Sequence, residues 1–334
     1  MMSVTWGPVK RAAAAAILAV LTLLLADSCV VFRTVNGIQD AFVEESDVGL
    51  AAGAMPALIK VEEGVLNANP KDQGATVQTA QLYVTYANAF IQGPAQDLDA
   101  QHFEEKHAAD LRAKALYIRA FKLLDPALDR RAPGIVELWK TGTLQPSDAA
   151  DPAQRGMPKG GSALLARFSA KDVPLLYWSA ASILAAYAVD PLDLHLSSIV
   201  GLAKALLDRA LVIEPAWNDG GLQELAISVY GSFPAELGGD PAVALAAYKK
   251  GLEITKGQSA SLYVTYAGTI CVPEDNYPAF KASLDAALAI DPDANPKMRL
   301  ATTIAQANAR RMLAHAGDYF LQVPDQAPGS GGPN

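Results

Sequence analysis

The residues of this chain that could do chemistry are few and scattered. The 334-residue sequence holds two cysteines, Cys29 and Cys271, and four histidines, His102, His107, His195 and His315. His102 and His107 are five residues apart, so they do not share a helix face as metal ligands three or four apart would. Cys271 lies in the apolar phrase SLYVTYAGTIC, which gives a Cys–His nucleophile no support. We predict no metal site and no cofactor.

Carboxylates are numerous but poorly arranged for catalysis. Glu62-Glu63, Glu104-Glu105 and Asp148 with Asp151 are the candidate pairs for glycosidase acids. Neighbours on a helix point about 100° apart and do not flank one bond, so these groups read as solvated surface. Gly160-Gly161 and Gly238-Gly239 lack the Lys-Ser/Thr that grips phosphate and read as turns. We expect no enzyme; an all-helical hydrolase remains a third hypothesis.

Aromatic residues are more informative, because several occur in the most apolar segments. Tyrosine combines a large apolar body with a hydroxyl that needs a partner when buried. Our candidate ligand-binding residues are Tyr83, Tyr86, Phe90, Tyr177, Trp178, Tyr187, Tyr263 and Tyr266. They either line an internal pocket for an apolar ligand with a polar end or form the core between helices. Ala at Tyr86 or Trp178 should reduce ligand retention more than thermal stability under the first hypothesis.

The elements that carry these residues follow a recurring phrase, an apolar helix closed by an acid or Asn and then Pro. It is KVEEGVLNANP at Pro70, LLDRALVIEP at Pro215, SLDAALAIDP at Pro292 and, more weakly, YIRAFKLLDP at Pro126. Proline cannot continue a helix, and this is how tetratricopeptide-type repeats end their second helix. We predict an all-α domain over residues 49–322, an α-solenoid of stacked helical hairpins whose concave face binds ligands or partners.

Individual helices can be placed along this domain. The first, in AAGAMPALIKVEEGVLNANP, should carry Leu58, Val61, Val65 and Leu66 on one side; GATVQTAQLYVTYANAFIQG is the second. Asp240 should cap a helix that begins with Pro241. LYVTYA occurs at Leu82–Ala87 and Leu262–Ala267, consistent with corresponding positions in two halves. Further helices are expected at 101–124, 195–213, 217–231, 240–254, 258–272, 275–289 and 296–314. The strongly apolar phrase VPLLYWSAASILAAYAVD should form another helix, in the centre of the stack.

Residues outside these helices indicate export and irregular segments. Residues 1–28 read as a signal peptide with Lys10, Arg11 and a short apolar stretch, and 29–48 as lipid attachment and tether. LLLADSC places Cys29 as a lipid-bearing cysteine, although Asp27 is unusual for a lipobox; an ordinary secretory signal or a short anchor is the alternative. The Pro- and Gly-rich stretch 142–162 should be a loop and 323–334 a disordered tail.

Composition limits the classes of protein that fit. The chain is 51% hydrophobic and 19% charged, enough for a sizeable core. Its net charge of −8 and the lack of a basic patch argue against nucleic acid as a partner. The export signal and Cys29, together with this composition, lead us to expect a protein outside the cytoplasm that is anchored by lipid to a bacterial membrane.

Several phrases together resemble a known family. The resemblance is carried by the leader and by the phrases LYVTYANAF, ALYIRAFKLL, VPLLYWSAASI, LLDRALVIEPAWNDGG, SFPAELGGDPAVALAAYKKGLEIT and RLATTIAQANARRML. Over about residues 50–320 the chain resembles the TatT family, the T component of tripartite ATP-independent periplasmic (TRAP) transporters. The most specific parts of the resemblance are Leu176–Trp178 and Phe233–Asp240.

This resemblance implies a function that the residues alone do not give. It implies a homotrimeric lipoprotein that pairs with the periplasmic solute-binding protein of a TRAP transporter and holds or hands over a small apolar organic ligand. The alternative is a tetratricopeptide-like scaffold lipoprotein that recognises peptides in envelope assembly.

Overall fold

The chain folds almost entirely into helices. The computed structural model describes residues 40–143, 157–235 and 238–323, and these contain no β-strand. The all-α prediction is confirmed. The signal peptide, Cys29, most of the 142–162 loop and nearly all of the 323–334 tail lie outside the described residues.

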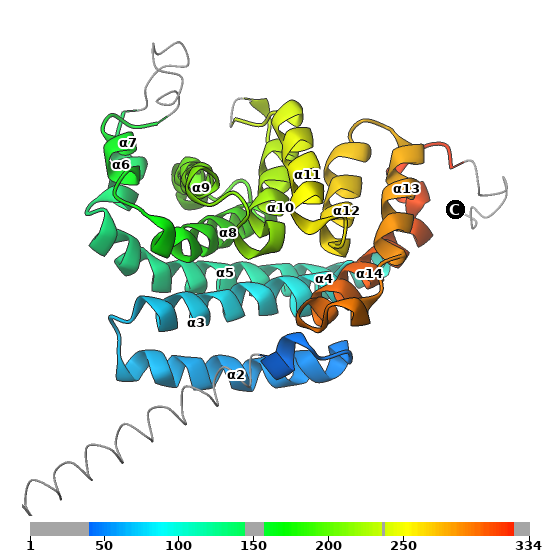
Figure 1. Cartoon of the computed structure of the whole chain (residues 1–334), viewed down its shortest axis with the longest axis horizontal. Helices are drawn as coiled ribbons and strands as arrows, with labels where there is room; N and C mark the ends of the chain where they lie inside the picture. The colour runs from blue at the N-terminus through cyan, green and yellow to red at the C-terminus, as the bar shows by residue number, and fades with distance from the viewer. Residues whose placement is uncertain (1–39, 144–156, 236–237, 324–334) are drawn as a thin grey trace, which may run out of the picture.

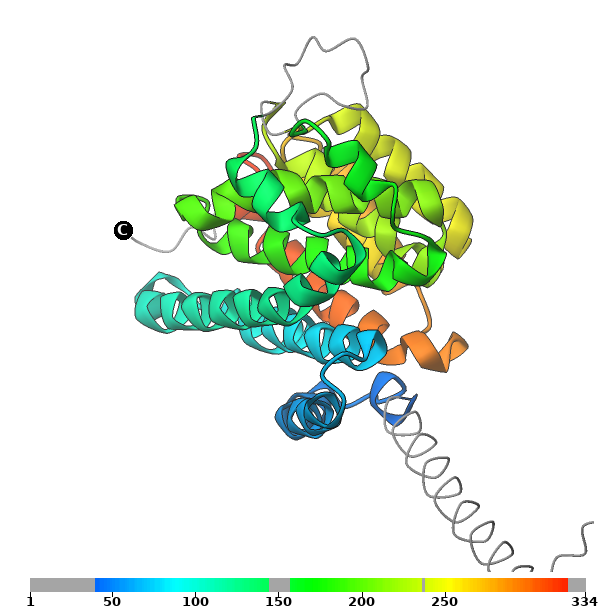
Figure 2. The ribbon, with the colours of Figure 1, turned by 90° about the vertical axis from the view of Figure 1, so that its left-hand side faces the viewer.

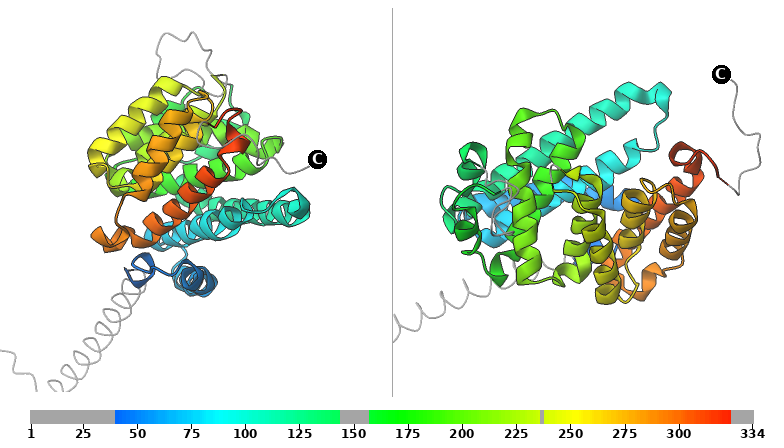
Figure 3. Two further views of the ribbon diagram at one scale, coloured as in Figure 1. Left: turned by 90° about the vertical axis from the view of Figure 1, so that its right-hand side faces the viewer. Right: turned by 90° about the horizontal axis from the view of Figure 1, so that it is seen from above.

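Two groups of helices build the molecule (Figure 1). The long helices α2 (Val48–Ala68), α3 (Gln73–Thr85) and α5 (Phe103–Arg131) lie side by side as one layer. A row of helices stands across this layer, comprising α10 (Trp217–Ser232), α11 (Pro241–Thr255), α12 (Ala260–Tyr266) and α13 (Tyr277–Leu288). Helix α8 (Val173–Val189) packs on α5, and α9 (Leu194–Ile213) packs on α8. Figures 2 and 3 show the same arrangement from other sides, with the row of α10–α13 covering the layer of α2, α3 and α5.

Helix α14 (Arg299–Ala314) brings the end of the chain back to its beginning. It packs on α12 and α13 and also reaches α2. The remaining helices are short: α4 (Gly93–Ala95), α6 (Ile135–Thr141), α7 (Gly161–Leu165), α15 (Ala316–Tyr319), and 3-10 turns at Ala100–His102, Ala170–Asp172, Pro292–Ala294 and Pro296–Met298. The sequence did not lead us to expect α6, which a seven-residue apolar stretch encodes weakly.

Helix starts are set by aspartates, as the sequence suggested for one of them. The Asp240 side chain accepts hydrogen bonds from the backbone N–H groups of Ala242 and Val243, and Pro241 is the first residue of α11. Asp47, Asp72 and Asp193 cap α2, α3 and α9 in the same way. Each cap satisfies N–H groups that have no partner within the helix.

Three of the four helix–proline phrases end as predicted. Helix α2 ends at Ala68 and α9 at Ile213, each two residues before the proline, and α13 ends at Leu288 before Pro292 opens a 3-10 turn. The prediction for Pro126 was wrong, because α5 continues through it to Arg131. The last turns of α5 bury Ala127 and Leu128 completely, and this burial offsets the backbone hydrogen bond that proline removes.

The predicted apolar side of α2 is also wrong in part. Leu58 and Leu66 are buried, but Val61 and Val65 are 51% and 38% exposed. The helix turns Ile59 and Glu62 inward instead, where the Glu62 carboxylate accepts a hydrogen bond from Gln78 of α3. Packing of α2 on α3, in which this polar contact takes part, therefore decides which side of α2 is buried.

The apolar helix expected to be central is α8. Leu175, Leu176 and Ile183 on it are fully buried between α5 and α9. Among the described residues, the stretch Ala170–Val189 is the one long and apolar enough to span a membrane, but 61% of it is buried by its neighbours. It serves here as the core helix. Consecutive helices do pack in pairs, and the tetratricopeptide-like solenoid remains a prediction.

Candidate ligand cavity

The repeated hexapeptide LYVTYA adopts the same local structure twice. Its first copy ends α3 and its second copy ends α12, and each leads into a π-helical segment, Tyr86–Gln92 and Ala267–Cys271. In a π-helix the hydrogen bonds run to the fifth residue, which widens the turn, and such segments are frequent at functional sites. The two copies thus match in structure as well as in sequence.

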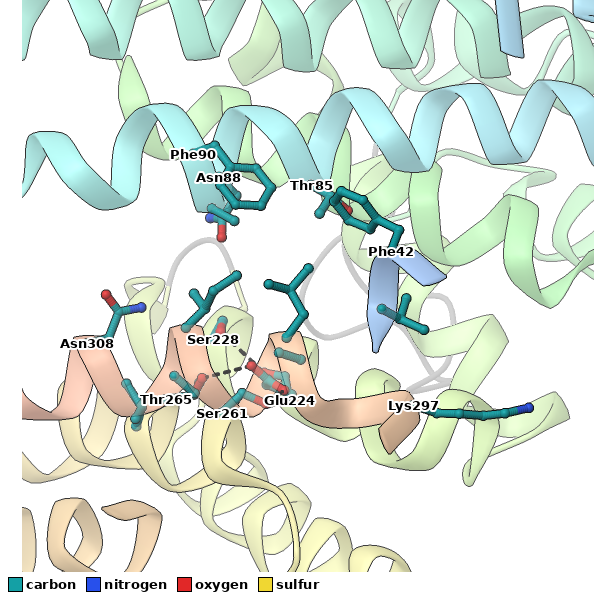
Figure 4. Close-up of a pocket in the computed structure, with 17 residues that line it drawn as sticks. Phe42, Thr85, Asn88, Phe90, Glu224, Ser228, Ser261, Thr265, Lys297 and Asn308 are labelled. Carbon is teal, nitrogen blue, oxygen red and sulfur yellow. Dashed lines mark hydrogen bonds between the residues drawn. The ribbon is translucent and has the colours of Figure 1, made fainter. Parts of the chain in front are cut away.

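A cavity of about 510 Å³ lies between the two helix groups, with residues of both repeats in its wall. Thr85 and Thr265, the fourth residues of the two hexapeptides, both line it (Figure 4). The π-segment after α3 contributes Asn88, Ala89 and Phe90 from above, and α14 contributes Leu300, Ile304 and Ala305 from below. The remaining lining residues are Phe42, Val43, Glu224, Ser228, Ser261, Val264, Lys297, Ala301 and Asn308.

Helix α14 forms one wall of this cavity and is held at both ends by arginines. The guanidinium of Arg299 donates to the backbone carbonyl of Glu44 at 2.8 Å, and Nε of Arg311 lies 3.3 Å from the carboxylate of Asp97. Both partners belong to the N-terminal part of the molecule. The first and the last parts of the chain therefore meet at the cavity, and α10 and α12 supply the rest of its wall.

Glu224 of α10 is the polar centre of the cavity. Its carboxylate accepts hydrogen bonds from the Ser261 hydroxyl at 2.7 Å and the Thr265 hydroxyl at 3.2 Å (Figure 4). No Lys, Arg or His nitrogen of the described residues lies within 4.0 Å of it. Burial raises the pKa of Glu224 above its ordinary value, more than these two hydroxyls lower it.

Tyr177 of α8 lies close enough to Glu224 to be affected by its charge. Burial and then the Glu224 carboxylate raise the pKa of the Tyr177 phenol. The phenol ring contacts Trp178 and Trp217, each with a centroid distance of 4.8 Å. This aromatic cluster includes Trp217, the first residue of α10. The chain then passes through Asn218, Asp219 and Gly220 at positive φ, and Glu224 lies about one turn beyond Gly220.

The structure brings only part of our aromatic candidate set together. Phe90 lines the cavity, and Tyr86 lies beside it with its hydroxyl accepting from Arg112. The Tyr83 hydroxyl donates to Glu63, while Tyr263 and Tyr266 pack on Tyr248. Tyr177 and Trp178 form the cluster described above, and Tyr187 packs on Phe233. A ligand role for all eight candidates, Phe90 included, stays a prediction.

Reasoning from the sequence missed Glu224 and the two threonines. The signal that could have found the threonines is the repeated hexapeptide itself, which was noted for its symmetry and not for its polar member. Glu224 sits in GLQELAISVY, an ordinary helical phrase that gives no sign of a cavity.

Histidines and thiols form no second site in the described part of the chain. No group of three or more His, Cys, Asp or Glu residues there could hold a metal ion. His102 pairs with Asp99, and His107 stacks on Phe103. Cys271 is a buried free thiol, and burial raises its pKa.

A known protein family matches most of this chain. The family model of the TRAP transporter T-component matches residues 44–320. This range covers nearly all of the described helices, so the chain belongs to that family, whose members are accessory components of a transporter.

A similar protein occurs in Treponema pallidum. The chain is 32% identical over 280 residues to a protein of Treponema pallidum (strain Nichols), described as uncharacterized, and the match covers 84% of this chain and 82% of the relative. That description adds no ligand or partner.

Proposed function

We propose that this protein is a periplasmic T component, anchored to a bacterial membrane through lipid on Cys29, that holds or hands over a small apolar organic ligand. In this role it docks, as a homotrimer, to the periplasmic solute-binding protein of a TRAP transporter. Its helical pairs act as a tetratricopeptide-like stack. Membership of the T-component family supports the transporter association.

The observation that carries the ligand part of the proposal is the cavity between the helix groups. Its volume of about 510 Å³ lies within the range typical of small-molecule sites, roughly 300–1,000 Å³. Phe42, Phe90, Val264 and Ile304 supply apolar surface, and a few polar groups converge on one region. A ligand that has an apolar body and one polar end would match this lining.

Native mass spectrometry of the full-length protein, purified gently from cells, tests the proposal. We expect a trimer whose mass exceeds three denatured chains by a small organic adduct, and a larger species when a TRAP solute-binding protein is added. Ala89→Phe, which fills the cavity, should lose the adduct. Ala307→Phe, on an exposed part of α14 outside the lining, is the matched control.

The opposite result favours the scaffold hypothesis. A monomer without adduct that binds peptides would move the assignment to a peptide-recognising lipoprotein. The anchor is tested separately: the denatured mass should exceed the cleaved polypeptide by a diacylglyceryl group, and Cys29→Ser should release the protein from the membrane fraction.

A further inference from the structure

The cavity contains one acidic side chain without a basic partner. Glu224 lines it, and the other charged lining residue, Lys297, is exposed at its edge with the ammonium group directed away from Glu224 (Figure 4). In the described part of the chain no ion pair includes Glu224. The lining residues next to it are Ser228, Ser261 and Thr265, and the apolar part of the wall lies beyond them. An ionised carboxylate in such surroundings is costly unless a cation accompanies it.

The hydrogen bonds of Glu224 leave room for a further partner. A carboxylate offers about four acceptor positions, and the hydroxyls of Ser261 and Thr265 occupy one on each oxygen. Both hydroxyls can donate to the ionised carboxylate, and an ammonium group in the cavity would stabilise that ionised form against the effect of burial on its pKa. The open acceptor positions are available to a donor inside the cavity.

Aromatic rings lie on the wall opposite this carboxylate. Phe42 and Phe90 meet edge to face with a centroid distance of 6.4 Å, and both line the cavity across from Glu224 (Figure 4). Aromatic faces attract ammonium groups and also accept alkyl chains. Leu300 and Ile304 of α14 add apolar surface to the lining.

We infer that the cavity selects an organic ammonium compound, an amine with an apolar body, and that Glu224 is the residue that recognises its cationic end. This inference rests on the proposed function and specifies the chemical class of its ligand. The alkyl or aryl part lies against the phenylalanines and α14, while the N–H groups donate to the Glu224 carboxylate. Glu224 thereby excludes carboxylate ligands, which it would repel.

Three probes of equal chain length test the inference: octylammonium, 1-octanol and octanoate, titrated into the full-length protein and followed by ligand-observed NMR. We expect octylammonium to bind roughly 10- to 100-fold more tightly than octanol, the range that a hydrogen bond to a charged group contributes, and octanoate to bind most weakly. Glu224→Gln should lower the octylammonium affinity by about that factor and leave the octanol affinity within about 2-fold of its value in the unaltered protein. Glu214→Gln, at an exposed glutamate outside the lining, should change neither.

Each other result overturns the inference in a distinguishable way. Equal binding of octanol and octylammonium would leave an apolar ligand site, as the proposed function requires, without selection by charge. Preference for octanoate would make the ligand an acid. Failure of all three to bind would contradict the ligand part of the proposed function as well, whereas docking to a solute-binding protein would stand on its own assay. If Glu224→Gln does not fold, the order of the three probes on the unaltered protein decides.

Discussion

Asp172 should be among the most important carboxylates for stability. It is fully buried at the start of α8 and accepts hydrogen bonds from Arg131 at 2.7 Å, from the Ser169 N–H at 3.0 Å, from the Ser169 hydroxyl at 2.9 Å and from Gln73 at 3.4 Å. Gln73 belongs to α3 and Arg131 to α5, so this one side chain joins three helices. We choose Asp172→Asn, which preserves its shape and removes its charge.

The expected loss follows from these contacts. Removing one partner of a buried ion pair costs about 3–5 kcal/mol when the remaining charge is buried. The Arg131 side chain is 30% exposed and therefore keeps part of its hydration. We expect the free energy of unfolding to fall by about 2–3 kcal/mol. The matched control is Asp285→Asn, because Asp285 pairs with Lys281 at a similar 2.8 Å but is 52% exposed, where such a pair contributes about 0.3–0.5 kcal/mol.

The pH dependence gives a second, independent readout. Burial alone would raise the pKa of Asp172, but Arg131 and Ser169 outweigh it and hold the pKa below its ordinary value. A carboxyl whose pKa is lower in the folded protein stabilises it above the unfolded value, about 3.9, and loses that contribution as the pH falls through the folded value. The difference between the unaltered protein and Asp172→Asn should therefore be constant from about pH 8 to 5 and shrink below about pH 4.

Urea unfolding followed by far-UV circular dichroism measures both quantities. The reasoning is refuted if Asp172→Asn costs no more than Asp285→Asn, or if the difference between variant and unaltered protein grows from pH 5 to pH 8. A changed slope with urea concentration would show that the variant alters the compactness of the unfolded or native state, so the slope is compared first.

Three further predictions test packing and closure. Gly239→Ala should destabilise the protein by about 2 kcal/mol or more, because the added Cβ would lie 1.7 Å from the Phe233 carbonyl oxygen. Gly53→Ala, where a Cβ on α2 meets open space, should stabilise the protein by about 0.5–1 kcal/mol. Thermal unfolding compares the two variants. Cys271 should resist iodoacetamide at pH 8 in the folded protein and react in urea, as peptide mass mapping would reveal. Arg311→Ala should lower the free energy of unfolding by under about 1 kcal/mol yet increase amide hydrogen exchange in α14. Unchanged exchange would contradict a role of Arg311 in holding the end of α14 in place.

Helix positions could be predicted well from the sequence because their signals are local. Capping aspartates such as Asp240 and prolines such as Pro215 act on their own helix, and the structure has α9, α10 and α11 within one residue of the expected bounds at almost every end. Pro126 and the orientation of α2 were missed because distant packing decides them. The burial of Leu128 and the contact of Glu62 with Gln78 involve other elements, which no local pattern encodes.

The candidate site was less predictable than the helices for a similar reason. A cavity is defined by what surrounds it, and Glu224 meets residues near positions 42, 90 and 300 only after folding. The aromatic candidates mark apolar segments correctly as buried or half-buried, but most of their rings pack on other aromatic rings. The repeated hexapeptide is the local feature that does point to the site, through Thr85 and Thr265.

The two arginine contacts of α14 have a consequence for how the protein is made. Arg299 meets Glu44 across 255 positions of sequence, and Arg311 meets Gln96 across 215. Contacts of such long range form late, because the loop they close is entropically costly. A nascent chain has no cavity until its last long helix has been synthesised and docked, so a ligand bound there favours the completed protein over every partial one by mass action.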